Sequence, residues 1–139
     1  MFHKIMVAYD ESSEAFRALR ASIELAKTLS AELSVVTVLE PPRLLFLCGK
    51  RGTGLELDRG KRVRYSALQA EARQQAKAAG VLLDAELISG DEVGSIVECA
   101  KRHHSDLLVL GMRKHGWLMA GHTAQDIAER APCAVLGIK

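Results

Sequence analysis

Five short apolar runs, separated by stretches with the period of an amphipathic helix, constrain the fold of this chain more than any other feature. The runs are rich in valine, isoleucine and leucine, and they span residues 5–8, 33–39, 81–88, 107–110 and 134–138. Continuous apolar runs of about four to eight residues are typical of strands that are covered on both faces. Strands that alternate with helices predict an α/β fold, with a parallel sheet and helices on both of its faces.

The stretches between the runs carry the signals of about four helices. The first is expected to start at Ser12 or Ser13, since serine is a common N-cap, and to bury one face. Its predicted buried residues are Phe16, Leu19, Ile23 and Ala26. A second apolar face runs over residues 65–79 and ends before Gly80, a natural residue after a helix. Asp91 is the expected N-cap of the third helix, and the fourth lies near residues 124–131.

Length and composition indicate one globular domain over residues 1–139. The net charge of +2 is too small to predict binding to nucleic acid or to an anionic membrane surface. The N-terminus lacks the pattern of a signal peptide, and even the apolar run Leu44–Cys48 is far shorter than the roughly 20 residues that span a bilayer. The three cysteines have no disulfide-framework or zinc spacing, so we expect a reducing compartment, the cytoplasm.

We expect the five strands to lie in the order 3-2-1-4-5, which reverses the winding direction of the sheet between the first and fourth strands. Ligands of such folds bind beyond the carboxyl ends of the strands at this switch point. The important loops are therefore residues 10–13, 41–56 and 111–122. The connection from Pro41 to about Leu57 is expected to be a long irregular loop. Its apolar segment, Leu44–Cys48, is expected to pack against protein or to contact a partner.

The loop from Gly111 to Thr123 is the most informative segment for function. Glycines let backbone N–H groups turn toward a ligand, and the N-terminus of a following helix attracts anions. Thr123 is therefore a candidate for a hydrogen bond to phosphate. Alternatively, Thr123 caps the helix together with Asp126 three residues later, and the charge of Asp126 then opposes an anion. The residues leave both interpretations open.

Four blocks of the sequence together resemble the universal stress protein family. Lys4–Ser12 is similar to its opening strand and aspartate turn, and Gly90–Asp91 precedes the third helix as in the family. Ser105–Gly111 and Ala131–Leu136 are similar to its later blocks. The resemblance covers nearly the whole chain apart from the connection after Pro41. It implies a single Rossmann-like domain, of the adenine nucleotide alpha hydrolase-like type, in a regulatory or stress-response protein.

Members of this family that bind ATP carry the signature G-x2-G-x9-G-[S/T] after the fourth strand. Gly111 matches the first glycine, but Lys114 stands where the second is expected. Gly121 follows Gly111 by ten positions and not thirteen, and His122 stands where serine or threonine is expected. The shorter loop is closer to the universal stress protein A branch, whose members lack the signature and do not bind ATP in the usual way.

The resemblance also implies an adenine-nucleotide site at the carboxyl ends of strands 1, 2 and 4. Asp10 matches the aspartate near the ribose, Ala8 the strand-end residue near the adenine, and Val38 a residue whose backbone holds the adenine. The expected binding residues are Ala8, Asp10, Val38, Gly111, Arg113, Gly121, His122 and Thr123. The expected ligand is ATP or AMP, with magnesium in the case of ATP.

The main alternative is a homodimeric interaction protein without a nucleotide. The resemblance implies a homodimer through the edge of the fifth strand, and Trp117 or the Leu44–Cys48 segment would then fill the ligand site. No catalytic residue is assigned, because no positioned general base is visible; at most we expect slow nucleotide hydrolysis.

Two further clusters receive no functional assignment from the sequence. His103 and His104 are adjacent and are expected to point to different sides of a helix. His115 and His122 could meet in the loop after Gly111, but no cysteine or carboxylate has suitable local spacing, so no metal site is assigned. A basic cluster lies around the long connection, but it has no interleaved aromatic residues and is expected to be a solvated face. Its members are Lys50, Arg51, Arg59, Lys61, Arg62 and Arg64.

Overall fold

A sheet of five parallel strands, in the order β3-β2-β1-β4-β5, is the centre of the fold. The computed structural model describes residues 1–41, 51–113 and 123–139, and of residues 51–57 it describes the backbone only. The strands are β1 (Lys4–Ala8), β2 (Glu32–Leu39), β3 (Leu83–Ser89), β4 (Leu107–Gly111) and β5 (Ala134–Ile138). The predicted strand order is confirmed.

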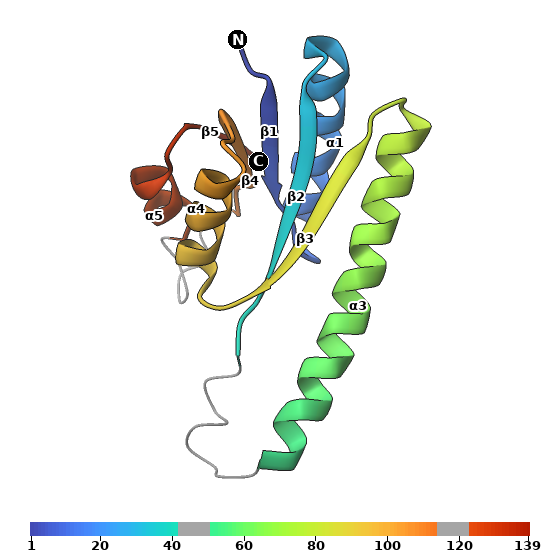
Figure 1. Ribbon diagram of the computed structural model, residues 1–139, viewed down its shortest axis with the longest axis vertical. Coiled ribbons are helices and arrows are strands. Elements are labelled where there is room, and N and C mark those ends of the chain that lie inside the picture. Colours follow the sequence, from blue (N-terminus) through green and yellow to red (C-terminus); the bar gives the residue numbers. More distant parts are fainter. Residues whose placement is uncertain (42–50, 114–122) are drawn as a thin grey trace.

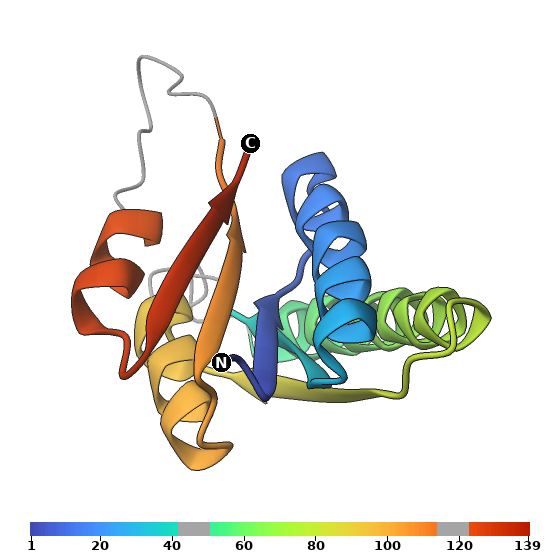
Figure 2. The same ribbon diagram turned by 90° about the horizontal axis from the view of Figure 1, so that it is seen from above.

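Helices cover both faces of this sheet, as the sequence predicts. Those in the described ranges are α1 (Ser13–Leu29), α3 (Arg51–Ala78), α4 (Glu92–Arg102) and α5 (Thr123–Arg130). Figures 1 and 2 show α1 and α3 on one face and α4 and α5 on the other. None of these helices is long and apolar enough to cross a membrane.

Two apolar cores fill the spaces between the sheet and these helix layers. The first joins Ile5 and Val7 of β1 to buried residues of α1 and α3. The second joins Met6 of β1 and Leu108 of β4 to buried residues of α4 and α5. Because successive side chains of a strand point to opposite faces, β1 contributes to both cores. This burial on both faces explains why the strands are continuous apolar runs.

The ends of the helices follow the predicted signals. Ser12 is the N-cap of α1 and accepts a hydrogen bond from Ala15 N at 3.1 Å. Asp91 is the N-cap of α4 and accepts from Gly94 N at 2.6 Å. Gly80 follows α3 with φ +83°, the left-handed conformation that favours glycine.

The buried face of α1 differs from the predicted one at Phe16. That side chain is 41% exposed, so its assignment to the buried face is wrong. The face that contacts the sheet is formed by Ala15, Ala18, Leu19, Ser22, Ile23 and Ala26. Small residues on this face let α1 lie close to the strands, and Ser22 satisfies its hydroxyl group by donating to Ala18 O at 2.8 Å. Phe16 lies beside this face.

The long helix α3 corrects the prediction of an irregular connection up to Leu57, because its backbone is helical from Arg51. Glycines at positions 52, 54 and 60 lower helix propensity and hid this start in the sequence. Ala72 and Ala76 are fully buried, as predicted, whereas Tyr65 is only partly buried. The amino-terminal half of α3 extends beyond the carboxyl ends of the strands (Figure 1).

Hydrogen bonds of Asp106 connect the start of β1 to the turn before β4. Its carboxylate accepts hydrogen bonds from His3 N at 2.8 Å and from Lys4 N at 2.9 Å, and Asp106 N donates to Lys4 O at 3.0 Å. Partial burial raises the pKa of this carboxyl group, but the backbone hydrogen bonds outweigh burial and hold the pKa below its ordinary value of 3.8. The charged form is therefore the one that the fold favours.

The free energy of unfolding should depend on Asp106 in acid. The pKa of the Asp106 carboxyl group is lower in the folded state than its ordinary value of 3.8. The group therefore stabilises the protein at pH values above 3.8, and this contribution is lost as the pH falls through the folded-state pKa. We expect Asp106→Asn to remove this part of the acid destabilisation. Urea unfolding over a series of acidic pH values measures it, and identical pH slopes for both proteins would refute the assignment.

Candidate functional site

The strands separate at their carboxyl ends between β1 and β4. The two strands are paired from Ile5–Leu107 to Val7–Val109. Beyond these pairs, β1 leads into the turn at Asp10, while Met112 N continues the pairing of β4 with β5 by donating to Ile138 O at 2.6 Å. The helices that follow β1 and β4 lie on opposite faces of the sheet. The predicted switch point is therefore present.

Asp10 lies just beyond the end of β1, where β1 and β4 separate; we call this region the split. One of its oxygens accepts a hydrogen bond from Ser12 N at 2.8 Å, which organises the turn into α1. The other oxygen lies 3.9 Å from Arg113 Nη2, and the Asp10 side chain is 42% exposed. The turn thus fixes the carboxylate and leaves one of its oxygens available.

The backbone of Val38 faces the same split. The register of β1 on β2 ends at Ala8 opposite Val36, and Tyr9 N donates to Val36 O at 2.9 Å. On the other side of β2, Gly90 N donates to Leu39 O at 3.1 Å. Successive residues of a strand turn their backbone groups to alternate neighbours. The N–H and C=O of Val38 therefore face the side of β1, beyond its last pair.

Gly111, the last residue of β4, is explained by close packing. A Cβ atom at this position would lie 2.5 Å from the carbonyl carbon of Glu14 and 2.6 Å from Ala15 N. Both atoms belong to the backbone of α1, which cannot move as a side-chain end does. A glycine here lets the first turn of α1 rest against the end of β4 and so positions the Asp10 turn.

Two carboxylates that were not predicted from the sequence, Glu40 and Glu92, lie near Asp10. Glu92 N donates to Glu40 Oε1 at 3.2 Å. Burial, with Glu40 and Asp10 nearby, raises the pKa of Glu92, and Arg113 opposes this shift. Glu40 follows β2 directly and Glu92 opens α4, so the rule that ligands bind at carboxyl ends would have pointed to both. Asp10, Glu40 and Glu92 therefore bring three carboxyl groups together at this end of the sheet, with Arg113 beside them.

The remaining predicted residues have different outcomes. Ala8 ends β1 and packs against the second core, and Thr123 is the first residue of α5. The structure thus brings Asp10 and Arg113 together, with Ala8, Val38 and Gly111 on the strands around them. Gly121 and His122 lie outside the described residues, as do Trp117 and the Leu44–Cys48 segment.

The predicted solvated basic face has acidic partners. Arg62 contacts Asp58 at 3.3 Å and donates to Ser89 Oγ at 2.7 Å. Arg64 forms an ion pair with Glu11 and lies over the ring of Tyr65, 5.7 Å from its centroid. The Arg64–Glu11 ion pair connects α3 to the Asp10 turn, and the Arg62–Ser89 hydrogen bond connects it to the end of β3. Lys50 and the side chain of Arg51 lie outside the described part of the chain.

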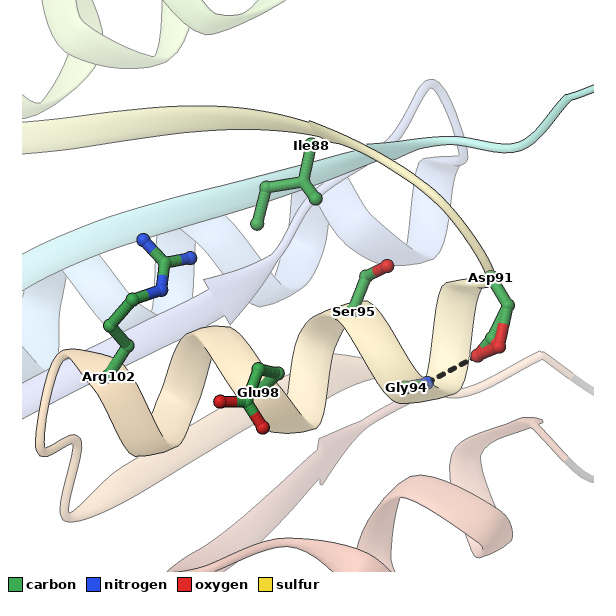
Figure 3. A pocket seen from close by; sticks show the side chains of 6 residues that line it. All are labelled: Ile88, Asp91, Gly94, Ser95, Glu98 and Arg102. Atoms are coloured by element: carbon green, nitrogen blue, oxygen red, sulfur yellow. Dashed lines mark hydrogen bonds between the residues drawn. The ribbon is translucent and has the colours of Figure 1, made fainter.

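A pocket of about 300 Å³ lies between the end of β3 and α4 (Figure 3). Its lining residues are Ile88, Asp91, Gly94, Ser95, Glu98 and Arg102. It shares no residue with the predicted nucleotide site. The Asp91 carboxylate points to Gly94 N and caps the helix, so it is already used in a hydrogen bond (Figure 3).

Comparison with known proteins identifies the family. A family model described as the universal stress protein family matches residues 1–139. This chain belongs to the universal stress protein family. A relative from Thermus aquaticus, a universal stress protein in the QAH/OAS sulfhydrylase 3′ region, is 31% identical, and the match covers 100% of both chains.

Solved structures share the fold of this universal stress protein. One is a universal stress protein in complex with cAMP, with TM-score 0.71 and 23% identity over 99% of this chain and 96% of that chain. Another is an Arabidopsis thaliana family member with AMP bound, with TM-score 0.70 and 20% identity over 99% of this chain and 91% of that chain. At these identities the likeness shows the fold alone.

Proposed function

We propose that this universal stress protein is a cytoplasmic regulatory module that binds an adenine nucleotide at the carboxyl ends of β1, β2 and β4. The backbone of Val38 beside the fixed carboxylate of Asp10 is the observation that carries the proposal. Adenine has an amino donor next to a ring-nitrogen acceptor, which suits the C=O and N–H of one residue. A carboxylate at Asp10 suits the ribose hydroxyls, as in other nucleotide-binding α/β folds.

The phosphate would lie toward Arg113 and the start of α5. Arginine favours phosphate oxygens, and a helix N-terminus favours negative charge. Thr123 opens α5, and the resemblance adds Gly121 and His122 from the preceding loop. The magnesium that the resemblance associates with ATP would be held between the phosphates and this acidic end of the sheet.

Among adenine nucleotides we propose that AMP is preferred over ATP. Asp10, Glu40 and Glu92 place negative charge at this end of the sheet, and each added phosphate charge is repelled by it. The loop after β4 is also shorter than the ATP-binding signature. The AMP and cAMP complexes of proteins with the same fold agree with a ligand that carries one phosphate.

Thermal unfolding with millimolar AMP, ADP, ATP or GMP, with and without magnesium, tests the proposal. AMP should stabilise the protein by about 2 kcal/mol or more, since a ligand at 100 times its Kd contributes about 2.7 kcal/mol. ATP should stabilise it less, most clearly without magnesium. GMP should have little effect, because the donor and acceptor on the matching edge of guanine are exchanged.

Asp10→Asn is the matched variant, because an amide oxygen can still accept from Ser12 N. A hydrogen bond to a charged group is about 1–2 kcal/mol stronger than a neutral one, so AMP affinity should fall roughly 10-fold. Asp58→Asn, on the exposed pair with Arg62, should leave affinity unchanged. Cooperative melting without a shift for any nucleotide would reject the proposal and favour the homodimeric interaction protein.

We propose that the protein forms a homodimer through the β5 edge, whether or not it binds a nucleotide. β5 is the last strand of the sheet, and its residues are exposed or only partly buried. An unpaired strand edge offers backbone donors and acceptors to a second chain. A dimer built there would leave the split between β1 and β4 accessible, so it is compatible with nucleotide binding.

A further inference from the structure

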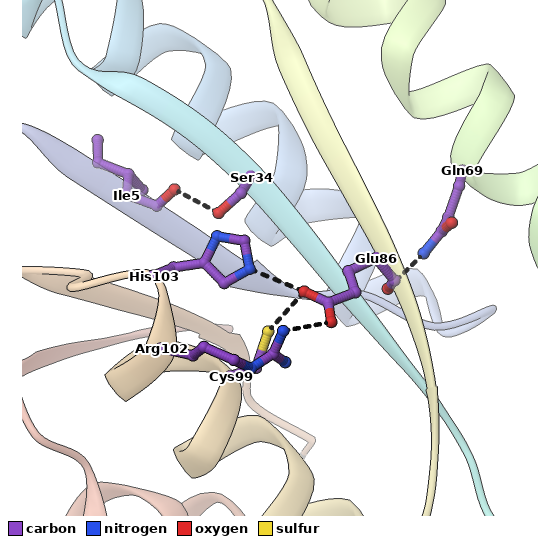
Figure 4. A network of polar contacts seen from close by, with 7 residues as sticks. All are labelled: Ile5, Ser34, Gln69, Glu86, Cys99, Arg102 and His103. Atoms are coloured by element: carbon purple, nitrogen blue, oxygen red, sulfur yellow. Dashed lines mark hydrogen bonds and ion pairs between the residues drawn. The ribbon is translucent and has the colours of Figure 1, made fainter.

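Three side chains of types that can bind metal ions meet between the edge strand β3 and the end of α4 (Figure 4). Glu86 comes from β3, Cys99 from the last turn of α4, and His103 from the residue that caps α4. Their ligand atoms all lie within 4.8 Å of one another. Cys99 and His103 are four residues apart, which places them on one side of the helix end.

Two of the three ligand-to-ligand distances are close to those around a small ion, and the third, between Cys99 Sγ and His103 Nε2, is within 4.8 Å. Glu86 Oε2 lies 3.4 Å from Cys99 Sγ and 2.7 Å from His103 Nε2. Ligand atoms around a tetrahedral zinc ion, with bonds of about 2.0–2.3 Å, lie about 3.5 Å apart. The sulfur–oxygen distance already matches this value. The nitrogen–oxygen distance has to widen by less than 1 Å, because that contact is now a hydrogen bond.

The chemistry of the donor set indicates the class of ion. Thiolate and imidazole favour zinc and related transition metals, whereas magnesium and calcium prefer oxygen ligands. Three protein ligands leave a fourth position for water, as in open zinc sites. A pocket of about 250 Å³ adjoins the cluster and is lined by Asp84, Glu86, Cys99 and His103 among others. It supplies room for this water and a route for the ion.

Outer partners hold Glu86 in place. Arg102 Nη1 donates to Glu86 Oε1 at 2.8 Å, which leaves Oε2 directed toward the sulfur and the imidazole. Gln69, a buried residue, donates to Glu86 O at 2.8 Å and to Thr37 Oγ1 at 3.0 Å. Such partners orient ligands in metal sites. The charge of Arg102 opposes a cation, but the thiolate and carboxylate supply two negative charges against it.

We propose that Glu86, Cys99 and His103 bind one divalent transition-metal ion of the zinc class, with water as the fourth ligand. On binding, the Cys99 thiol proton leaves to solvent, and the His103 imidazole coordinates through Nε2 with its remaining proton on Nδ1. No metal site was predicted here, because Glu86 lies on a different element from Cys99 and His103 and has no suitable local spacing to them. The site shares no residue with the proposed nucleotide site, so either can fail alone.

Cobalt(II) titration of the reduced full chain tests the proposal, because cobalt(II) can occupy zinc sites. A bond between cobalt and a thiolate gives a sulfur-to-cobalt absorption band. We expect one equivalent to produce this band and zinc to abolish it. Cys99→Ser should remove the band, and His103→Gln should weaken affinity more than about 100-fold, beyond the 10- to 100-fold effect of outer partners. The matched controls Cys133→Ser and His104→Asn should bind like the wild type.

Absence of the band in the folded wild type would overturn the proposal. So would a band that survives both Cys99→Ser and His103→Gln unchanged, since the sulfur ligand would then lie elsewhere. Cys99 is fully buried, and its replacement could impair folding. In that case His103→Gln decides, because the His103 side chain is 38% exposed and tolerates replacement better.

Discussion

Gly111→Ala should destabilise the protein by about 3 kcal/mol, the upper part of the usual range for overpacking. The added Cβ would lie 2.5 Å from the carbonyl carbon of Glu14 and 2.6 Å from Ala15 N. Neither backbone atom can yield without moving the first turn of α1 away from β4. The same movement would displace the Asp10 turn, so nucleotide affinity should fall as well. Urea unfolding and AMP titration measure the two effects.

Gly60→Ala is the matched control for this variant. Gly60 lies in α3, and a Cβ there would meet nothing within 4 Å. Alanine in an exposed helix interior is favoured over glycine by about 0.5–1 kcal/mol. The two glycine-to-alanine changes should therefore have opposite signs. Equal stability of the Gly111→Ala protein and the wild type would contradict the close packing of α1 against β4.

Leu108→Ala should cost about 2–5 kcal/mol, the range observed for large-to-small changes in a core. Leu108 is 0% exposed on β4 and packs in the core that includes Ile96, Cys99 and Ile127. Its removal leaves a cavity between the sheet and the α4–α5 layer. Such a loss is a large share of the roughly 5–15 kcal/mol that stabilises a typical domain.

Leu82→Ala provides the comparison with the same change of side chain. Leu82 is 90% exposed just before β3, and substitutions at such positions usually stay within about 0.5 kcal/mol. Chemical unfolding of both variants separates the effect of burial from that of residue type. A small effect at Leu108 would contradict a tightly packed layer of α4 and α5 on this face.

The sheet was predictable from the sequence because its strands are buried on both faces. Such strands appear as continuous apolar runs, and glycines, serines and aspartates mark the helix ends between them. Ser12 and Asp91 act as the predicted caps. The strand order follows once the runs are assigned to a doubly wound sheet.

Features that depend on tertiary packing were not predictable in this way. Helix α3 starts at Arg51 despite Gly52 and Gly54, although local propensity argues against a helix there. The buried face of α1 contains small residues that an apolar pattern does not select, so Phe16 was placed on the wrong side. Neither feature has a strong local signal.

The candidate sites also combine residues that the sequence indicates with residues that only the tertiary structure brings together. Asp10 and Arg113 follow strands at the switch point, so topology and the family resemblance both indicate them. The direction in which the Val38 backbone faces depends on where β1 ends against β2, which only the register shows. Glu86 meets Cys99 and His103 across 13 and 17 residues, from two different elements. No local spacing in the sequence reveals that meeting.

The most direct test of the nucleotide site is an NMR titration of the labelled protein with AMP, followed amide by amide. The Val38 amide should shift to saturation and gain protection from exchange with solvent, because its N–H would bond to the adenine. The amide of Ser12, which donates to the Asp10 carboxylate, and the amide of Arg113, whose guanidinium lies 3.9 Å from that carboxylate, should shift with the same dissociation constant. Saturable shifts confined to other surfaces, or no saturable shifts at all, would contradict the account.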